Sequence, residues 1–177
     1  MSNHQSPINI IKWISLNSDE LLEACIQARF QGSGPGGQKR NRVYSGIRLV
    51  HEASGYSVEA DAHRESRRNL HDALHKLRLK LAISITFSSN ETETIFEKSP
   101  IFQATPFRYP INPSHVDFPL FAMRAIYFLN KYQGQLSPTA QALGCSTSVL
   151  GRFLKTEKMI WFKTQEIRKA NDLHCLK

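Results

Sequence analysis

The sequence predicts an α+β fold: a small antiparallel sheet covered by one helix, then a proline-rich linker and a small helical, helix-turn-helix-like unit. Three observations predict this class. Side chains over 43–60 alternate between apolar and polar around a turn that ends at Gly55, which is typical of a hairpin. An apolar stripe at helical spacing follows, and half of the eight prolines then fall within 88–115. We therefore place the domains at 1–87 and 116–177, joined by a linker at 88–115.

The first domain is predicted element by element. Residues 1–15 show no clear period, whereas Asn17 or Ser18 can cap a short helix with acidic residues in its first turn. A first strand is expected over 24–30, and the hairpin supplies two more. One face of the second strand is expected to be buried, and the helix that follows is expected to cover it with an apolar stripe. The two sets are Val43, Ser45, Ile47 and Leu49 on the strand, and Leu70, Ala73, Leu74, Leu77 and Leu81 on the helix.

The C-terminal half has the pattern of consecutive helices. An apolar stripe over 121–132 predicts the first, and Ser137 followed by Pro138 predicts a cap with proline at the first helical position of the second. Gly144 marks a turn, and Ser146 can cap a further helix. The last residues, 163–177, are expected to form a fraying helix.

The spacing of Ala140, Gly144 and Leu150 is typical of a helix-turn-helix, with Arg152 and Lys155 exposed on the second helix. Such a unit either contacts nucleic acid or only packs, and the sequence leaves both alternatives open.

Composition limits the function classes. The net charge is +8, and each half carries +4, with 12 basic and 8 acidic residues up to Asn90 and 11 and 7 after it. Three scattered cysteines argue against a disulfide framework and for a reducing compartment. The apolar run at 120–129 is too short for a bilayer and contains Arg124. We expect a cytoplasmic protein without membrane contact, metal or cofactor.

The most constrained stretch is the glycine-rich segment 32–38, followed by Lys39, Arg40 and Arg42. Four glycines in six positions permit close approach of the backbone to another molecule, and the stretch from Arg29 to Arg48 holds five basic residues and no acidic one. A nucleotide-binding loop fits poorly, because a strand-like run rather than a helix follows. A flexible surface loop is the other alternative.

The segment Gly34–Asn41, read Gly-Pro-Gly-Gly-Gln-Lys-Arg-Asn, resembles the GGQ signature of class I peptide chain release factors and of their short relatives that rescue stalled ribosomes. The resemblance continues through the predicted hairpin into the helix ending near Leu81. It implies a GGQ-type domain in which Gly36, Gly37 and Gln38 act on the ester of peptidyl-tRNA in the ribosomal peptidyl transferase centre. It also implies that Gln38 is a candidate for modification by a glutamine methyltransferase.

The same resemblance implies contacts to RNA near the loop, and basic residues elsewhere in the chain add further candidates. Those expected near the loop are Ser33, Lys39, Arg40, Asn41 and Arg42. The predicted helix adds Arg64, Arg67 and Arg68 on its basic face, where Lys76, Arg78 and Lys80 follow, and this face is either solvated or directed at RNA. Arg152 and Lys155 are the candidates in the C-terminal half. His71 and His75 have the spacing of a helical metal pair, but no further ligand accompanies them.

Three functions are compatible with the sequence. The first is codon-independent, ribosome-dependent hydrolysis of peptidyl-tRNA, since a chain of this length has no room for the domains that read stop codons. The second is a non-catalytic adaptor that binds the ribosome or RNA. The third is a DNA-binding regulator built on the C-terminal unit. Two departures from the family bear on the choice: the C-terminal half looks folded rather than a basic tail, and the helix entry reads Arg64-Glu65-Ser66 where the family has Arg-Ser-Gln.

Overall fold

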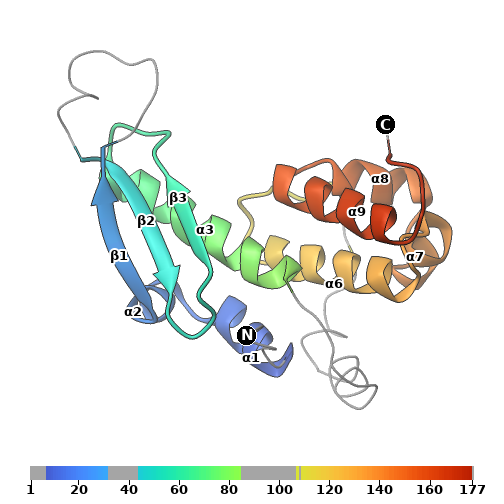
Figure 1. Cartoon of the computed structure of the whole chain (residues 1–177), viewed down its shortest axis with the longest axis horizontal. Coiled ribbons are helices and arrows are strands. Elements are labelled where there is room, and N and C mark those ends of the chain that lie inside the picture. Colours follow the sequence, from blue (N-terminus) through green and yellow to red (C-terminus); the bar gives the residue numbers. More distant parts are fainter. Residues whose placement is uncertain (1–6, 32–43, 85–106, 108, 177) are drawn as a thin grey trace. The chain divides into compact units, whose positions relative to one another are not determined.

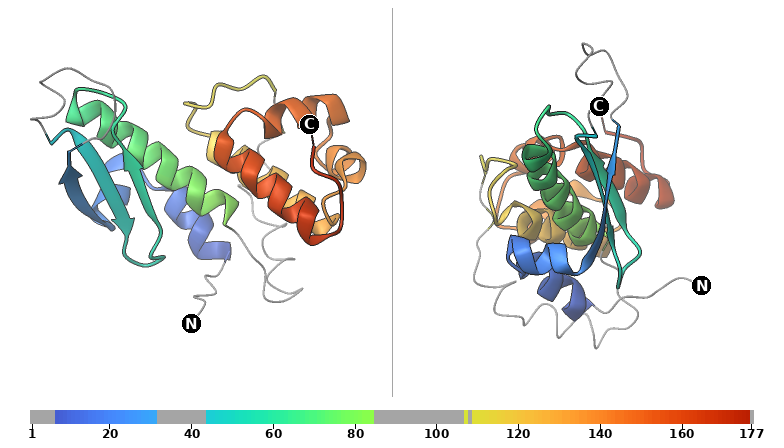
Figure 2. Two further views of the ribbon diagram at one scale, coloured as in Figure 1. Left: turned by 45° about the horizontal axis from the view of Figure 1, so that its top comes forward. Right: turned by 90° about the vertical axis from the view of Figure 1, so that its left-hand side faces the viewer.

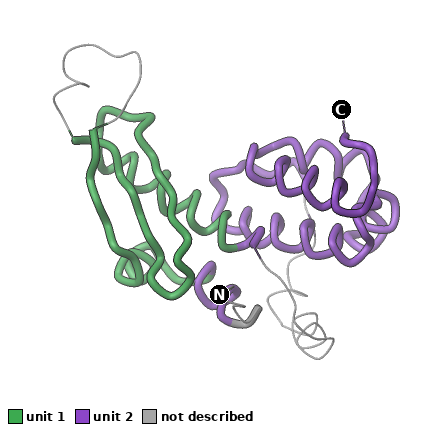
Figure 3. Tube along the Cα trace, viewed as in Figure 1, with its two compact units in different colours: residues 1–3, 15–81 green, residues 4–14, 82–177 purple. Residues whose placement is uncertain are grey.

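The computed structural model describes residues 7–31, 44–84, 107 and 109–176 (Figure 1). Two compact units divide the chain: one comprises 1–3 and 15–81, the other 4–14 and 82–177 (Figure 3). The described residues form one three-stranded antiparallel sheet and seven helices, which confirms the predicted α+β class. The predicted linker, 88–115, lies mainly outside the described residues, so the domain division stays a prediction.

The sheet of the first unit is a meander in the order β1-β2-β3, with both neighbouring pairs antiparallel. Gly55 closes the β2–β3 turn with φ +69°, and its N–H donates to the carbonyl of His51 at 2.8 Å. That left-handed φ is one that glycine adopts without strain. The predicted hairpin is therefore confirmed. The strands are β1 (Cys25–Phe30), β2 (Gly46–His51) and β3 (Ser57–Ala60).

Helix α3 (Ser66–Ile83) lies across one face of the sheet, as both views in Figure 2 show. Ile47 and Leu49 of β2 are buried on that face, together with Ala73 and Leu77 of the helix. These are positions that the alternation and the helical period predicted. The core of this unit is thus a single layer between sheet and helix, and the outer face of the sheet carries both polar side chains and the exposed Ile26.

Helix α2 (Ser18–Glu23) begins as the sequence predicts. The Asn17 side chain accepts from the backbone N–H groups of Asp19 and Glu20, and the Glu20 carboxylate accepts from the Asn17 N–H at 3.0 Å. This capping box satisfies three N–H groups that a helix start would otherwise leave unpaired.

The second unit is helical. Its core is aromatic: Phe118, Phe121 and Phe153 are buried, and the ring of Phe107 meets the ring of Phe153 edge-on at a centroid distance of 4.9 Å. Helix α1, which the sequence did not predict, belongs to this unit up to residue 14. The helices are α1 (Pro7–Ser15), α6 (Phe118–Lys131), α7 (Leu136–Ala142), α8 (Thr147–Leu154) and α9 (Lys158–Ala170).

The α7–α8 pair has the predicted turn but not the predicted start. Gly144 has φ +69°, and Ser146 caps α8 by accepting from the Val149 N–H at 3.3 Å, as expected. The cap predicted at Ser137 is wrong, because α7 begins after Gln135. Pro138 therefore lies inside the first turn, where a backbone N–H has no intrahelical acceptor and proline loses nothing.

The helix predicted over 163–177 is confirmed as far as Ala170, where α9 ends, but the prediction that it frays is wrong. Thr164 and Ile167 are buried in α9, and Gln165 exchanges two hydrogen bonds of 3.0 Å with the backbone of Leu176. The Arg168 side chain donates to the carbonyl oxygen of His174 and also to that of Gly134, before α7. The end of the chain is therefore held against its own helix. Within the described residues, no helix has both the length and the hydropathy needed to span a bilayer.

Candidate functional site

The predicted catalytic residues, Gly36, Gly37 and Gln38, lie outside the described residues. Five of the predicted RNA contacts do as well: Ser33, Lys39, Arg40, Asn41 and Arg42. The described residues end at Gln31, just after β1, and resume at Tyr44, just before β2. We call residues 30–31 and 44–46 the loop stem, because they join the glycine-rich segment to the sheet.

One side of the loop stem is a tight contact between neighbouring strands. Phe30, the last residue of β1, pairs with Gly46, the first of β2. A Cβ at position 46 would lie 2.8 Å from the Phe30 ring and 2.9 Å from the Phe30 carbonyl oxygen, distances that real Cβ atoms do not show. Only glycine fits there without a shift of strand or ring. The ends of both strands are consequently fixed against each other.

Polar contacts extend this arrangement across the sheet. The Arg48 guanidinium lies 6.0 Å from the centre of the Phe30 ring, and its Nε and Nη2 contact Glu59 Oε1 of β3 at 2.7 and 2.6 Å. Arg48 and Glu59 are directly opposite each other in the register. Because both side chains are about half exposed, the ion pair contributes little stability by itself. Its geometric effect is to link the ring at the loop stem to the third strand.

The other side of the loop stem is held by Asn69, a fully buried polar residue in the first turn of α3. Its Nδ2 donates to the carbonyl oxygens of Ser45 at 2.7 Å and His63 at 2.8 Å, and its Oδ1 accepts from the His63 N–H at 2.9 Å. Three of the hydrogen bonds that a buried amide can make are thus formed. The same side chain ties together the return of the chain to β2 and the entry to α3.

This contact also locates the predicted arginines. Because Asn69 binds Ser45, the start of α3 lies beside the loop stem, and Arg64, Arg67 and Arg68 are exposed at that end. Arg68 lies 3.1 Å from Glu65, but both groups are well exposed. Within the described ranges, Arg64 and Arg67 form no ion pair. The structure therefore places uncompensated positive charge at the same end of the unit as the loop stem.

Comparison with known families identifies this arrangement. Residues 11–100 match the model of the RF-1 domain, a range that includes the three strands, α2 and α3 with the loop stem between them. The chain belongs to the RF-1 domain family. Membership in this release-factor family implies release-factor-like activity in translation termination or rescue, and interaction with the ribosome and tRNA. No solved structure matches the chain at a significant level of similarity.

The later cations of α3, by contrast, have structural contacts. Lys76 and Lys80 donate to the carbonyl oxygens of Glu59 and Ser57 at 3.0 and 2.8 Å, which ties α3 to β3. Arg78 donates to the Leu16 carbonyl at 3.0 Å, and burial lowers its pKa. The basic face expected along the whole helix is therefore divided. Its first part is exposed, and its second part is bound to the protein's own backbone.

The C-terminal candidates lie outside the range matched by the RF-1 domain. Arg152 is exposed near the end of α8, and its guanidinium lies 5.4 Å from the centre of the Tyr109 ring. Lys155, the residue after α8, is exposed with its Nζ 5.4 Å from the Trp161 ring. The structure brings these two cations together with aromatic rings in the second unit. Their contact with RNA stays a prediction.

The histidine pair of α3, His71 and His75, has one acidic residue beside it, Asp72. His71 Nδ1 lies 3.7 Å from Asp72, whose other oxygen is 3.1 Å from His63 Nε2. Burial lowers the pKa of His75, as do the nearby His71 and Arg78, while Asp72 opposes this. In the part of the chain that the structure describes, no group of three or more histidine, cysteine or acidic residues is arranged to hold a metal ion.

Sequence reasoning missed the two residues that fix the loop stem. A signal for Asn69 was present: it stands four and eight residues before Ala73 and Leu77, on the buried stripe of the helix. A polar side chain on such a stripe has to find hydrogen-bond partners inside the protein. The role of Gly46 has no comparable signal, because the contact with Phe30 follows from the strand register and not from local sequence.

Proposed function

We propose that the protein hydrolyses the ester bond of peptidyl-tRNA in the peptidyl transferase centre of the ribosome and so frees nascent chains from stalled ribosomes, without reading a stop codon. The observation that carries the proposal is Gly36-Gly37-Gln38 in its extended context, within a chain of the RF-1 domain family. The place of action is then the cytoplasm, where the ribosome supplies the rest of the catalytic site.

The reaction adds a water oxygen to the ester carbonyl carbon, and the tetrahedral intermediate then expels the 3′ oxygen of the tRNA, which takes up a proton. The Gln38 amide has no proton equilibrium near neutral pH and therefore does not serve as a general base. Its backbone N–H is a donor for the developing oxyanion, and its side chain orients water or excludes other nucleophiles. Gly36 and Gly37 allow the backbone to present that N–H in a crowded cavity.

The described residues support this role by fixing the loop stem. The contact between Phe30 and Gly46 holds the end of β1 against the start of β2. Asn69 binds Ser45, the residue before β2. Catalysis by a backbone donor depends on position, since an error of about an ångström weakens the bond to the oxyanion. Arg64 and Arg67, exposed at the same end, are suited to neutralising rRNA phosphates.

The test is peptide release from purified ribosomal complexes that carry labelled peptidyl-tRNA. Gln38→Ala and Gly37→Ala are expected to lower the release rate by about a hundredfold or more, the scale of losing one oxyanion donor. Gln38→Pro, which removes the N–H itself, is expected to lower it at least as far. Gln141→Ala, at an exposed glutamine of α7, is the matched control and should release at the wild-type rate.

The mRNA in those complexes distinguishes rescue from termination. We expect release with a truncated mRNA and no increase when a stop codon occupies the decoding site. A rate that requires a stop codon would contradict codon independence. Wild-type rates for Gln38→Pro would contradict the role of its N–H, whereas salt-sensitive binding to ribosomes with no release by the wild-type protein would instead identify a non-catalytic adaptor.

A further inference from the structure

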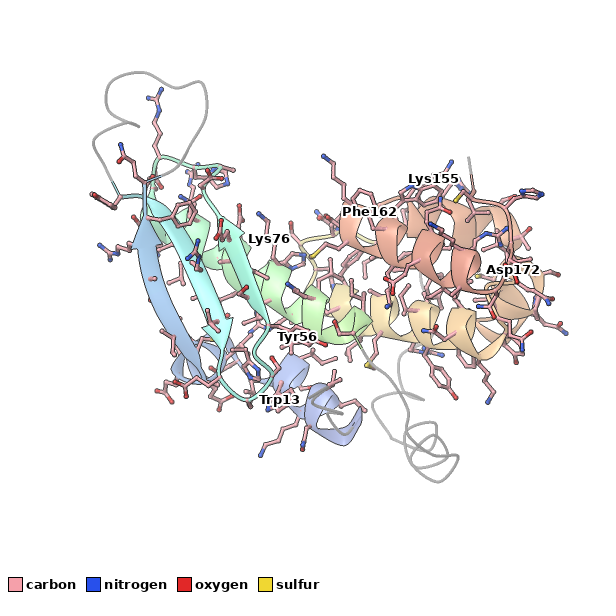
Figure 4. The ribbon with its side chains drawn as sticks, viewed as in Figure 1. Trp13, Tyr56, Lys76, Lys155, Phe162 and Asp172 are labelled. Carbon is pink, nitrogen blue, oxygen red and sulfur yellow. The ribbon has the colours of Figure 1, made fainter. Side chains whose placement is uncertain are left out.

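The second unit carries an exposed aromatic residue that its own fold does not use. Phe162 lies on the outer face of α9 with 69 % of its surface exposed, while the core of the unit is formed by other residues. Single exposed apolar side chains are common. This one differs because a second aromatic residue, Trp161, precedes it and is covered on one side by a cation, Lys155. Figure 4 shows Lys155 and Phe162 on the same edge of the unit.

Three exposed cations stand near this pair along the chain, with Glu157 and Glu166 as the acidic residues beside them. Lys158 is exposed on α9 one turn before Phe162, and Arg152 is exposed on α8 one turn before Lys155. Within the described residues, none of these three cations takes part in a salt bridge. By contrast, Lys163, the residue after Phe162, lies 3.0 Å from Glu166 and forms an ion pair with it. The charge around Phe162 is therefore available to an external anion.

We propose that Arg152, Lys155, Lys158, Trp161 and Phe162 form a surface that binds RNA with unpaired bases, with the Phe162 ring stacking on a base and the cations contacting phosphates. Aromatic rings interleaved with lysine and arginine are the usual means of holding single-stranded nucleic acid. We call these five residues the α8–α9 surface. It lies outside the range matched by the RF-1 domain and is therefore distinct from the peptide-releasing site.

The position of the charges argues against duplex DNA. A helix-turn-helix reads DNA through the first residues of its second helix. Here those residues are Thr147 and Ser148, whereas the cations stand at the end of α8 and the start of α9. An exposed phenylalanine has no base face to meet in a stacked duplex. Membership in a family that acts on the ribosome makes RNA the available partner.

Fluorescence anisotropy with the full chain and a labelled single-stranded oligoribonucleotide of about 12 nucleotides tests the proposal, because such a probe can span one binding surface. Phe162→Leu keeps the apolar area but removes the ring, and is expected to weaken binding about tenfold, within the range reported for loss of one stacked base. Phe162→Tyr keeps the ring and should bind as the wild type does. Both substitutions are at an exposed position and leave the core untouched.

Two lysines of the same helix provide the charge test. Lys158→Gln should weaken binding and reduce the slope of log affinity against log salt by about 0.7, the value for one single-strand phosphate contact. Lys169→Gln removes one exposed lysine from the other end of α9 and should leave both quantities unchanged. Equal effects of the two substitutions would mean that only the overall charge matters, and would overturn the proposal.

A spectroscopic measurement locates the contact, since the basic residues near the glycine-rich segment also attract RNA. The chain has two tryptophans, so Trp13→Phe leaves Trp161 as the sole indole. Its fluorescence should change as the single-stranded probe binds. An unchanged signal, wild-type affinity in Phe162→Leu, or tighter binding of duplex DNA than of single-stranded RNA would each refute the α8–α9 surface as an RNA site.

Discussion

Replacement of Asn69 by leucine tests whether one buried amide holds the loop stem. Leucine has the same number and branching of side-chain heavy atoms as asparagine, so Asn69→Leu opens no cavity, but it leaves the carbonyl oxygens of Ser45 and His63 and the His63 N–H without their partner. Each buried backbone group left unsatisfied costs about 1–3 kcal/mol. His63 is only half-buried and can be partly rehydrated, so we take the lower end and expect a loss of about 3 kcal/mol in the free energy of unfolding.

Urea unfolding followed by circular dichroism measures this loss. Asn69→Asp gives the matched comparison, because the introduced carboxylate keeps an acceptor for His63 but faces two carbonyl oxygens. Those neighbours raise the pKa of the introduced carboxyl in the folded state above the unfolded value of about 3.9. The variant's stability is therefore fully present below about pH 4 and is lost as the pH rises through the folded pKa. Asn69→Leu should show no such dependence.

The same variants separate folding from function. At a temperature where Asn69→Leu remains folded, we expect a lower maximal rate of peptide release, while the protein concentration that gives half-maximal release stays near the wild-type value. That split would indicate a misplaced glycine-rich segment rather than lost ribosome binding. A free energy of unfolding within about 0.5 kcal/mol of wild type for Asn69→Leu would refute the reasoning, since a surface substitution gives no more than that.

Further predictions concern two glycines and one histidine. Gly46→Ala should lower stability by about 1–3 kcal/mol, because the new methyl group would overlap Phe30. Gly151→Ala in α8 has open space around the new Cβ and should raise the free energy of unfolding by about 0.5–1 kcal/mol. Urea unfolding that finds the same sign of change for both glycine variants would contradict the packing argument. Burial lowers the pKa of His51 below 6.5, although Glu52 opposes this, so stability is fully present above pH 6.5 and falls as the pH drops. His51→Gln should make unfolding curves between pH 7 and 5 less pH-dependent, and an unchanged slope would exclude this histidine as a contributor.

Local patterns predicted those parts of the fold that depend on local physics. Side chains at Ser45, Ile47 and Leu49 share a face because a strand has period two, and all three are buried as expected. Gly55 and Gly144 both have positive φ, a conformation that glycine adopts most readily. The sheet, its hairpin and the α7–α8 turn could therefore be predicted from the sequence.

Long-range contacts were beyond the same reasoning. Lys76 and Lys80 were expected on a uniform basic face, yet each donates to a carbonyl of β3, and nothing local to the helix specifies that acceptor. Likewise, the end of the chain was expected to fray. The hydrogen bonds that hold it join Gln165 and Leu176, which are eleven positions apart, and no local pattern in the sequence indicates that pairing. Of the predicted site, the sequence supplied the arginines near the loop stem but not the buried asparagine that places them there.

The contact between Phe30 and Gly46, together with the bond from Asn69 to Ser45, has a consequence for engineering. Both anchors lie in the folded body of the unit, so the pairing of the strands does not depend on the number of residues between them. Insertions after Gln31 would thus extend the reach of the glycine-rich segment while the sheet keeps its alignment. The length of the glycine-rich segment and the sequence of the sheet can therefore be varied independently in this protein.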